Sequence, residues 1–386
     1  MTPATRKWIR RGGALALMYW IIRYYRRKMQ INRAGKAVVI TGCDSGFGRA
    51  LALRLSASSP TGGFARVFAA CLTDAGVASL RALERDTLCP LKLDVTDPRS
   101  LSRAAKRVGG ELALRATPIR LWGLVNNAGV QRGSLFDLSG AADYEACANV
   151  NYLGMVRCCK AFLPLLRPKG AGAGDRGGRI VNVTSYTGYQ ALPGVTAYAA
   201  SKHAAEAFTR GLGWELEPVW PGLRVISVAP GAHATPLYAA VPTTVPRATA
   251  QRDSATELYG KNYVAQVQSL LTRAAAPEAA GDPRHVVDAL EDALASAHPP
   301  KRYTVGIDAW FMRFISCLPH AVHDTVWTLF SALLPTPAAL ASDGAGAGGR
   351  RRVLLDLMMS VWRWLAGLGR APSSAVGDDA PPSVAK

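Results

Sequence analysis

Three polar residues near the middle of the chain have the types and the spacing needed to move a proton. Ser185 follows an apolar run, Tyr198 lies thirteen residues later, and Lys202 follows it in the segment Tyr-Ala-Ala-Ser-Lys. Residues four apart on a helix share one face, so the phenol and the ammonium can converge. A positive charge about 4 Å away would lower the pKa of a tyrosine by roughly three units. The spacing therefore predicts that Tyr198 is a general base, with Ser185 holding the substrate oxygen.

A glycine-rich turn near the start of the chain has the composition of a phosphate-binding site. The segment Thr-Gly-Cys-Asp-Ser-Gly-Phe-Gly at 41–48 follows an apolar run and opens a helical pattern. Glycines allow a tight turn and a close approach of the backbone to a pyrophosphate, which the free N–H groups of a helix N-terminus can bind. Taken singly, this segment also fits any tight turn, and the Tyr–Lys pair also fits an ordinary amphipathic helix. The functional interpretation rests on the occurrence of both motifs in this order along the chain.

The elements that must position these residues alternate along the chain. Short apolar runs alternate with helical patterns from residue 36 onward, which predicts βαβ units and a parallel sheet covered on both faces. The expected strands are 36–41, 66–71, 88–93, 121–127, 179–185, 223–230 and 302–305. The expected helices are 46–57, 74–84, 98–115, 141–166 and 197–217. Right-handed crossovers then give an α/β fold with a doubly wound parallel sheet of Rossmann type.

The chain from Lys36 to Tyr303 resembles the short-chain dehydrogenase/reductase family. The motifs that carry this resemblance are TGCDSGFG at 41–48, LDVTD at 93–97, NNAG at 126–129, NVNYLG at 149–154, NVTS ending at 185, YAASK at 198–202 and PG at 230–231 with Thr235. Within the family, CLTDAG at 71–76, LWGLVNNAG at 121–129 and SAHPPKRYTVGIDAW at 296–310 are similar to the microsomal retinol and hydroxysteroid dehydrogenases and to D-β-hydroxybutyrate dehydrogenase.

This resemblance implies a role for each matching residue. Tyr198 would be the acid/base, Lys202 would bind the nicotinamide ribose and lower the pKa of Tyr198, and Ser185 would orient the substrate. Asn151 would hold a water that links Lys202 to a proton relay. Besides Tyr198 and Lys202, the residues expected to contact the cofactor are Thr41, Gly42, Ser45, Gly46, Phe47, Gly48, Asp94, Val95, Asn127, Gly129, Pro230, Gly231 and Thr235.

Charges near the end of the second strand bear on the choice of nucleotide. A 2′-phosphate needs arginine or lysine there or inside the glycine turn, but the turn holds Cys43, Asp44 and Ser45, and the strand runs into Leu-Thr-Asp. Asp74 would repel a phosphate and accept a hydrogen bond from a ribose hydroxyl, or it would cap the helix that begins there, or both. The sequence therefore predicts NAD as the cofactor, with NADP as the alternative.

Composition and charge exclude several other classes of protein. The chain has 386 residues, of which 49% are hydrophobic, and a formal net charge of +19. Its seven cysteines contain no CxxC pair and its six histidines are dispersed, so we expect no disulfide framework and no metal site. Residues 1–36 hold ten Lys/Arg and no acidic residue, and this arm is also apolar. Such an arm favours a membrane surface over nucleic acid as the partner.

The pattern of apolar and polar segments predicts four regions. These are a basic, apolar anchor or targeting arm at 1–35, an NAD-binding catalytic domain at 36–308, apolar membrane-associated helices at 309–370 and a disordered tail at 371–386. Segment 233–277 breaks the strand–helix alternation and would cover the substrate. The apolar run 12–22 is too short to span a bilayer core near 30 Å. We expect an endoplasmic reticulum membrane, with the mitochondrial inner membrane as the alternative because the arm also fits a presequence.

The function expected from the sequence is hydride transfer between NAD and a lipophilic alcohol, either retinol or a hydroxysteroid, with Tyr198 as acid/base. The alternative is a dehydrogenase of a small 3-hydroxy acid such as D-3-hydroxybutyrate, which needs cations around the substrate carboxylate. The cations within 233–277 are too dispersed to decide: Arg247, Arg252, Lys261 and Arg273. The intact catalytic set argues against a protein that binds the cofactor without turnover. A homodimer is a further expectation.

Overall fold

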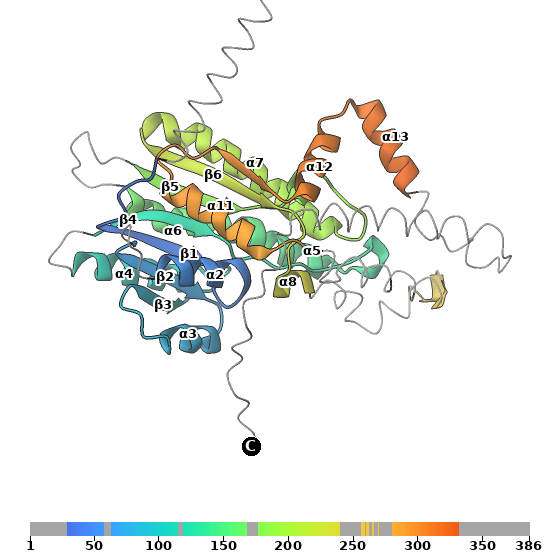
Figure 1. The fold of residues 1–386 in the computed structure, drawn as a ribbon. Helices are drawn as coiled ribbons and strands as arrows, with labels where there is room; N and C mark the ends of the chain where they lie inside the picture. Colours follow the sequence, from blue (N-terminus) through green and yellow to red (C-terminus); the bar gives the residue numbers. More distant parts are fainter. Residues whose placement is uncertain are drawn as a thin grey trace, which may run out of the picture.

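Seven strands form one parallel sheet in the order β3-β2-β1-β4-β5-β6-β7 in the computed structural model (Figure 1). They are β1 Lys36–Thr41, β2 Arg66–Cys71, β3 Leu88–Lys92, β4 Arg120–Asn126, β5 Gly178–Val183, β6 Leu223–Pro230 and β7 Arg302–Val305. The order reverses between β1 and β4, which confirms the doubly wound sheet and places the ligand crevice beyond the carboxyl ends of these strands.

The structure describes residues 29–57, 63–114, 119–167, 177–239 and 280–331, together with isolated residues between 256 and 269. The helices in these ranges that frame the sheet are α2 Gly46–Leu55, α3 Asp74–Arg81, α4 Pro98–Ala113, α5 Ala141–Ala148, α6 Met155–Leu166, α7 Thr196–Val219, α8 Pro236–Ala239, α11 Pro283–Ala295, α12 Ile307–Ser316 and α13 His320–Ser331. Among the described residues, no helix combines the length and the apolar character needed to cross a membrane.

Two apolar cores, one on each face of the sheet, fix the strands in place. Val38 and Ile40 of β1 face a core completed by α2 and α11, whereas Ala37 and Val39 face a core completed by α4 and α6. Successive side chains of a strand point to opposite faces, so a strand covered on both faces is apolar throughout. This explains why near-continuous apolar runs located the strands to within one or two residues.

The single helix expected over 141–166 is interrupted. A π-helical turn at Asn149–Gly154 separates α5 from α6 and carries Asn151. The turn packs closely on the segment after β3, because a Cβ placed on Gly154 would lie only 2.7 Å from a methyl carbon of Val95. Turns of this kind are rare and often mark functional sites. Apolar periodicity continued through the turn and therefore did not reveal it.

Parts of the expected terminal regions pack on the catalytic domain. The Ile31 amide donates a hydrogen bond of 2.8 Å to the Ala295 carbonyl, and Arg33 pairs with Glu291 of α11 at 2.9 Å. Helix α12 begins at Ile307, so the boundary expected at 308 lies within its first turn. Residues 1–28, the apolar stretch 353–368, the tail 371–386 and most of the expected substrate-covering segment lie outside the described residues.

Candidate active site

The glycine-rich segment forms the turn between β1 and α2. Gly42 and Gly46 have φ values of +69° and +58°, a conformation that costs glycine little and other residues much. Gly48 packs against Asn127 and against the backbone of Gly42. A Cβ on Gly48 would lie 2.4 Å from the Asn127 side-chain nitrogen and 2.5 Å from the Gly42 carbonyl oxygen. The turn is therefore closed so tightly that only glycine fits at this position.

Asn127 and Thr41 join this turn to the end of the neighbouring strand. The Asn127 side-chain amide donates hydrogen bonds to the carbonyls of Thr41 and Gly42, at 2.8 and 3.1 Å. The Thr41 hydroxyl in return accepts from the backbone amides of Asn127 and Ala128, both at 3.0 Å. These bonds hold the ends of β1 and β4 together at the switch point. Asn127 thus shapes the turn.

The first turn of α2 fits the pyrophosphate of a dinucleotide. Ser45 precedes the helix in an extended conformation and makes no side-chain cap hydrogen bond to it. The first N–H groups of a helix have no partner within the helix, and a helix N-terminus attracts an anion. An uncapped N-terminus behind a glycine turn therefore has the chemistry that a nucleotide phosphate requires.

Asp44, a turn residue to which the sequence assigned no role, is the carboxylate that reaches the end of β2. It accepts hydrogen bonds from the Leu72 amide at 2.7 Å and from the Thr73 amide and hydroxyl at 3.0 and 2.6 Å. Asp74, by contrast, is exposed and pairs with Lys92 at 2.6 Å. The residue that caps α3 is Thr73, so the alternative role of Asp74 as a helix cap is wrong.

The other expected cofactor residues lie along the same edge of the sheet. Asp94 follows β3, and its carboxylate accepts hydrogen bonds from the amide and hydroxyl of Thr96 at 2.8 and 2.7 Å. Val95 is buried against the π-helical turn. A Cβ on Gly129 would lie 3.4 Å from Asn151 Oδ1 and 3.8 Å from Lys202 Nζ, so this glycine lets the backbone pass close to the catalytic residues.

The structure brings Ser185, Tyr198 and Lys202 together at the carboxyl end of β5. Strand β5 ends at Val183, two residues earlier than expected, and Ser185 caps the short helix Tyr186–Gly188 that follows. Lys202 is buried and donates a hydrogen bond of 2.9 Å to the Val183 carbonyl. Its nitrogen lies 5.5 Å from the centroid of the Tyr198 ring. The three side chains that the spacing predicted to converge therefore lie close together, and their catalytic roles stay a prediction.

The expectation of a near-neutral pKa for Tyr198 is not met by the protein alone. Burial raises the pKa of Tyr198 above its ordinary value of 10, and a hydrogen bond with Ser185 opposes this shift only in part. Burial also lowers the pKa of Lys202 to about 8, so the ammonium stays mostly protonated at pH 7 but loses its proton in the mildly alkaline range. The Lys202 ammonium donates to a strand carbonyl beside the tyrosine ring, and the sequence spacing could not show this orientation.

Asn151 lies in the π-helical turn with its side chain fully engaged. Its Oδ1 accepts from the Val130 amide at 2.8 Å, and its Nδ2 donates to the Val130 carbonyl and to the Ser201 hydroxyl, both at 2.9 Å. Both amide hydrogens are therefore used. The side chain fixes the loop after β4 against α7, next to Lys202. Its role in holding a water remains a prediction.

The loop after β6 is anchored by Asp308, which lies in the motif at 296–310 and for which the sequence pattern predicted no role. Asp308 is buried in the first turn of α12 and accepts a hydrogen bond of 2.7 Å from the Ala232 amide. A Cβ on Gly231 would lie 2.1 Å from its carboxylate. The Gly231 amide also donates to the Val305 carbonyl at 2.8 Å. The motif Pro230-Gly231 is thus held by β7 and α12.

The same loop reaches back to the glycine turn. The His233 ring meets Phe47 edge-on at 6.0 Å, and its Nδ1 lies 3.1 Å from the Gly231 carbonyl. Thr235 lies beside Gly46, where a Cβ would be 3.8 Å from its methyl group. The glycine-rich turn and the loop expected to cover the nicotinamide are therefore in contact. Apart from isolated residues between 256 and 269, the expected cover from 240 to 277 lies outside the described residues.

Comparison with known proteins agrees with this architecture. Residues 36–245 match the short chain dehydrogenase family, which is more than half of the chain. The chain belongs to this family. It is therefore an oxidoreductase that uses a nicotinamide nucleotide, NAD or NADP.

Individual relatives are similar to this chain over most of its length. Human retinol dehydrogenase 5 is 35% identical over 331 residues, which cover 84% of this chain and 97% of that protein. Rat mitochondrial D-beta-hydroxybutyrate dehydrogenase is 34% identical over 312 residues, covering 76% of this chain and 84% of that protein. A short-chain dehydrogenase structure from Streptomyces avermitilis is 25% identical with a TM-score of 0.54, covering 77% of this chain and 95% of that one.

Proposed function

We propose that this protein is an NAD-dependent dehydrogenase of a lipophilic alcohol, a retinoid or a hydroxysteroid. The observation that carries the proposal is the convergence of Ser185, Tyr198 and Lys202 at the end of β5, beside the glycine turn. The similarity to retinol dehydrogenase 5 over nearly the whole of that enzyme supports the substrate class.

Each catalytic side chain has one task in the proposed mechanism. The glycine turn at 41–48 and the N-terminus of α2 would hold NAD, which would supply the hydride acceptor for the alcohol carbon. Tyr198 takes the hydroxyl proton at its phenolic oxygen, and the Ser185 hydroxyl holds the substrate oxygen. Lys202 supplies positive charge beside the tyrosine. Because burial raises the pKa of Tyr198, the phenol needs the positive charge of Lys202 beside it to act as a base, and an oxidised nicotinamide would add to that charge.

We base the proposed preference for NAD over NADP on the negative charge near the glycine turn. Asp44 places a carboxylate between the turn and the end of β2, the region where a 2′-phosphate would lie. A dianionic phosphate beside a carboxylate is repelled unless a cation lies between them. We therefore assign this selectivity to Asp44, with Asp74 kept as the rival candidate.

Two cations near the site already have partners within the protein, and this supports a lipophilic alcohol over a hydroxy acid as the substrate. Lys202 donates to the Val183 carbonyl, and Arg302 pairs with Glu206 at 2.6 Å. A substrate carboxylate would have to compete with these partners. A carboxylate buried without a cation is strongly disfavoured, whereas the apolar body of a retinoid or steroid is not.

A single assay tests the proposed substrate and cofactor together. Retinol, androstanediol and D-3-hydroxybutyrate are each supplied with NAD or with NADP, and formation of the reduced nicotinamide is followed. We expect kcat/KM at least about tenfold higher for a lipophilic alcohol than for hydroxybutyrate, and at least about tenfold higher with NAD. Equal efficiency with both nucleotides, or turnover of hydroxybutyrate alone, would contradict the corresponding half of the proposal.

Two matched variants assign the nucleotide selectivity. Asp44→Asn removes the charge beside the turn and should reduce the preference for NAD, while Asp74→Asn should leave it unchanged. The reverse outcome would assign the selectivity to Asp74 instead.

We also propose that α12 lies on a membrane surface, which in the cell would be the endoplasmic reticulum or the mitochondrial inner membrane. Helix α12 buries Asp308, Ala309, Met312 and Ile315 and exposes the opposite face, where Trp310 and Phe314 have 60% and 63% of their surfaces accessible. Figure 1 shows α12 and α13, in orange, beyond the end of β7. Exposed Trp and Phe on one helix face suit the headgroup boundary of a bilayer, and the net charge of +19 suits anionic lipid.

Removal of residues 1–28 should leave much of the protein bound to vesicles of phosphatidylcholine and phosphatidylserine at high salt. Salt screens the attraction of basic residues but not apolar insertion. Adding Trp310→Ser and Phe314→Ser to the truncated protein should weaken binding at least about threefold, because two aromatic contacts are lost. Trp214→Ser on α7, another exposed tryptophan, is the control and should change little. Complete release by the truncation alone would show that only the arm binds the membrane.

A further inference from the structure

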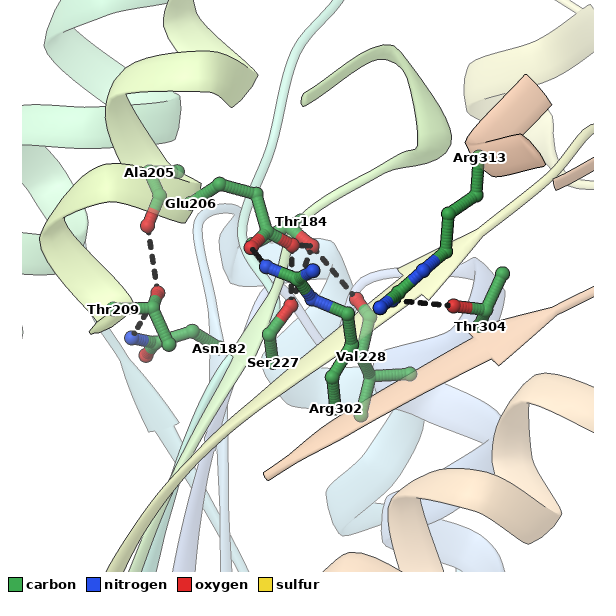
Figure 2. A network of polar contacts seen from close by, with 10 residues as sticks. All are labelled: Asn182, Thr184, Ala205, Glu206, Thr209, Ser227, Val228, Arg302, Thr304 and Arg313. Atoms are coloured by element: carbon green, nitrogen blue, oxygen red, sulfur yellow. Dashed lines mark hydrogen bonds and ion pairs between the residues drawn. The ribbon is translucent and has the colours of Figure 1, made fainter. Parts of the chain in front are cut away.

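A buried ion pair lies behind the catalytic residues. Glu206 of α7 is only 2% exposed and pairs with Arg302 of β7 at 2.6 Å. Its other carboxylate oxygen accepts hydrogen bonds from the hydroxyls of Thr184 and Ser227, at 2.7 and 2.5 Å. Figure 2 shows these side chains converging on the carboxylate from different elements. A buried carboxylate is tolerated only when a cation and hydrogen-bond donors surround it, and Glu206 has both.

This carboxylate is connected to Ser185 through the backbone. Thr184 immediately precedes Ser185, and its amide donates to the Val228 carbonyl at 2.8 Å while its hydroxyl donates to Glu206. The short helix after Ser185 rests on the same turn of α7, since a Cβ on Gly188 would lie 2.8 Å from the Lys202 carbonyl oxygen and 2.9 Å from the Glu206 side chain. The backbone on both sides of Ser185 is therefore fixed against Glu206.

The negative charge of Glu206 also acts on the Lys202 ammonium. Tyr198, Lys202 and Glu206 are spaced by four residues along α7 and share one face of it. The charged or titratable groups that act on Lys202 are Cys147 of α5 and Glu206, with Arg302 reaching it from β7 through Glu206. Burial raises the pKa of Cys147, so this thiol stays neutral. Glu206 therefore supplies the negative charge that opposes the loss of the Lys202 proton.

We propose that Glu206, paired with Arg302, is a positioning residue of this active site that fixes the backbone around Ser185 and keeps Lys202 in its charged form. The proposal rests on the roles given above to Ser185 and Lys202 and is independent of which alcohol is the substrate. It assigns a function in catalysis to Arg302 of β7. Arg302 acts by balancing the charge of Glu206 and by holding α7 against the edge strand.

The test compares Glu206→Gln with two other variants. Glu206→Gln keeps the shape and an acceptor oxygen but removes the negative charge, leaving the Arg302 charge uncompensated. The double variant Glu206→Gln, Arg302→Gln removes both charges, so no buried ion is left alone. Glu217→Gln is the matched control, because Glu217 also lies on α7 and pairs with the neighbouring Lys301 at 3.0 Å. Folding of each variant is checked by thermal unfolding and by NAD binding.

Two readouts separate a positioning role from a merely structural one. We expect the NMR titration of the Lys202 side-chain Cε, assigned by its loss in Lys202→Met, to shift about one pH unit lower in Glu206→Gln, because the opposing charge is gone. The double variant should lie between it and the wild type. We expect kcat to fall about tenfold or more in Glu206→Gln, with a smaller change in KM. The alkaline limb of the kcat profile should shift with the Lys202 titration.

Each outcome decides the proposal. Equal Lys202 titrations in the wild type, Glu206→Gln and the double variant would overturn it, as would the same shift in Glu217→Gln. If Glu206→Gln does not fold, the double variant gives the answer, and a wild-type titration and kcat in that protein would contradict the proposal. The Lys202 titration needs no substrate. Failure of the proposed substrate class therefore leaves this test intact.

Discussion

Tyr198→Phe should lower kcat by a factor of about 100 to 10,000, the range contributed by a positioned general acid or base. The substitution removes only the hydroxyl to which we assign the transfer of the substrate proton. The glycine turn and the N-terminus of α2, which would bind the cofactor pyrophosphate, are separate from Tyr198 and stay intact. NAD affinity, measured by titration of protein fluorescence, should therefore change less than about threefold.

The control for this prediction is Tyr144→Phe. Tyr144 lies on α5, is partly exposed and shares a hydrogen bond of 2.8 Å with the Thr196 hydroxyl, so the same atom is removed outside the proton-transferring set. This variant should keep nearly full kcat. A Tyr198→Phe enzyme that retains a tenth or more of wild-type turnover would assign the base to another residue.

Gly48→Ala should abolish most NAD binding and reduce stability. The added methyl would lie 2.4 Å from the Asn127 side-chain nitrogen and 2.5 Å from the Gly42 carbonyl oxygen, and neither can move without breaking the bonds that join β1 to β4. We expect the dissociation constant for NAD to rise at least about tenfold, because the turn can no longer close around a pyrophosphate. Overpacking of this kind costs about 1–3 kcal/mol in the free energy of unfolding.

Gly110→Ala provides the matched control on α4. A Cβ at Gly110 meets no atom within 4 Å, so the same change occurs there without a clash. This variant should bind NAD normally and be about 0.5–1 kcal/mol more stable, because alanine loses less conformational entropy than glycine in a helix. Normal NAD affinity in Gly48→Ala would show that the turn has more freedom than its contacts indicate.

The charge of the nucleotide-binding region shows where reasoning from the sequence was incomplete. Asp74 was the expected ribose partner because it follows the second strand in the chain. In the folded protein, Thr73 caps α3 and donates its hydroxyl to Asp44, whereas Asp74 pairs with Lys92. Asp44 lies 28 residues from Leu72, so their hydrogen bond depends on how β1 and β2 pair. A local pattern carries no signal for such a contact.

The sequence by itself determined the strands, the sheet class and the convergence of Tyr198 with Lys202. These features follow from short stretches of sequence. A continuous apolar run indicates a strand buried on both faces, and a spacing of four residues places two side chains on the same face of a helix. Only the tertiary structure decided how Asp308 anchors the loop after β6 and how Arg302 reaches Glu206, 96 residues away in the chain. Strand order and helix packing set these contacts. Strand order and helix packing bring together residues that are far apart in the chain and follow no helical or strand repeat. Because these residues are buried together, their charges interact more strongly than they would in water.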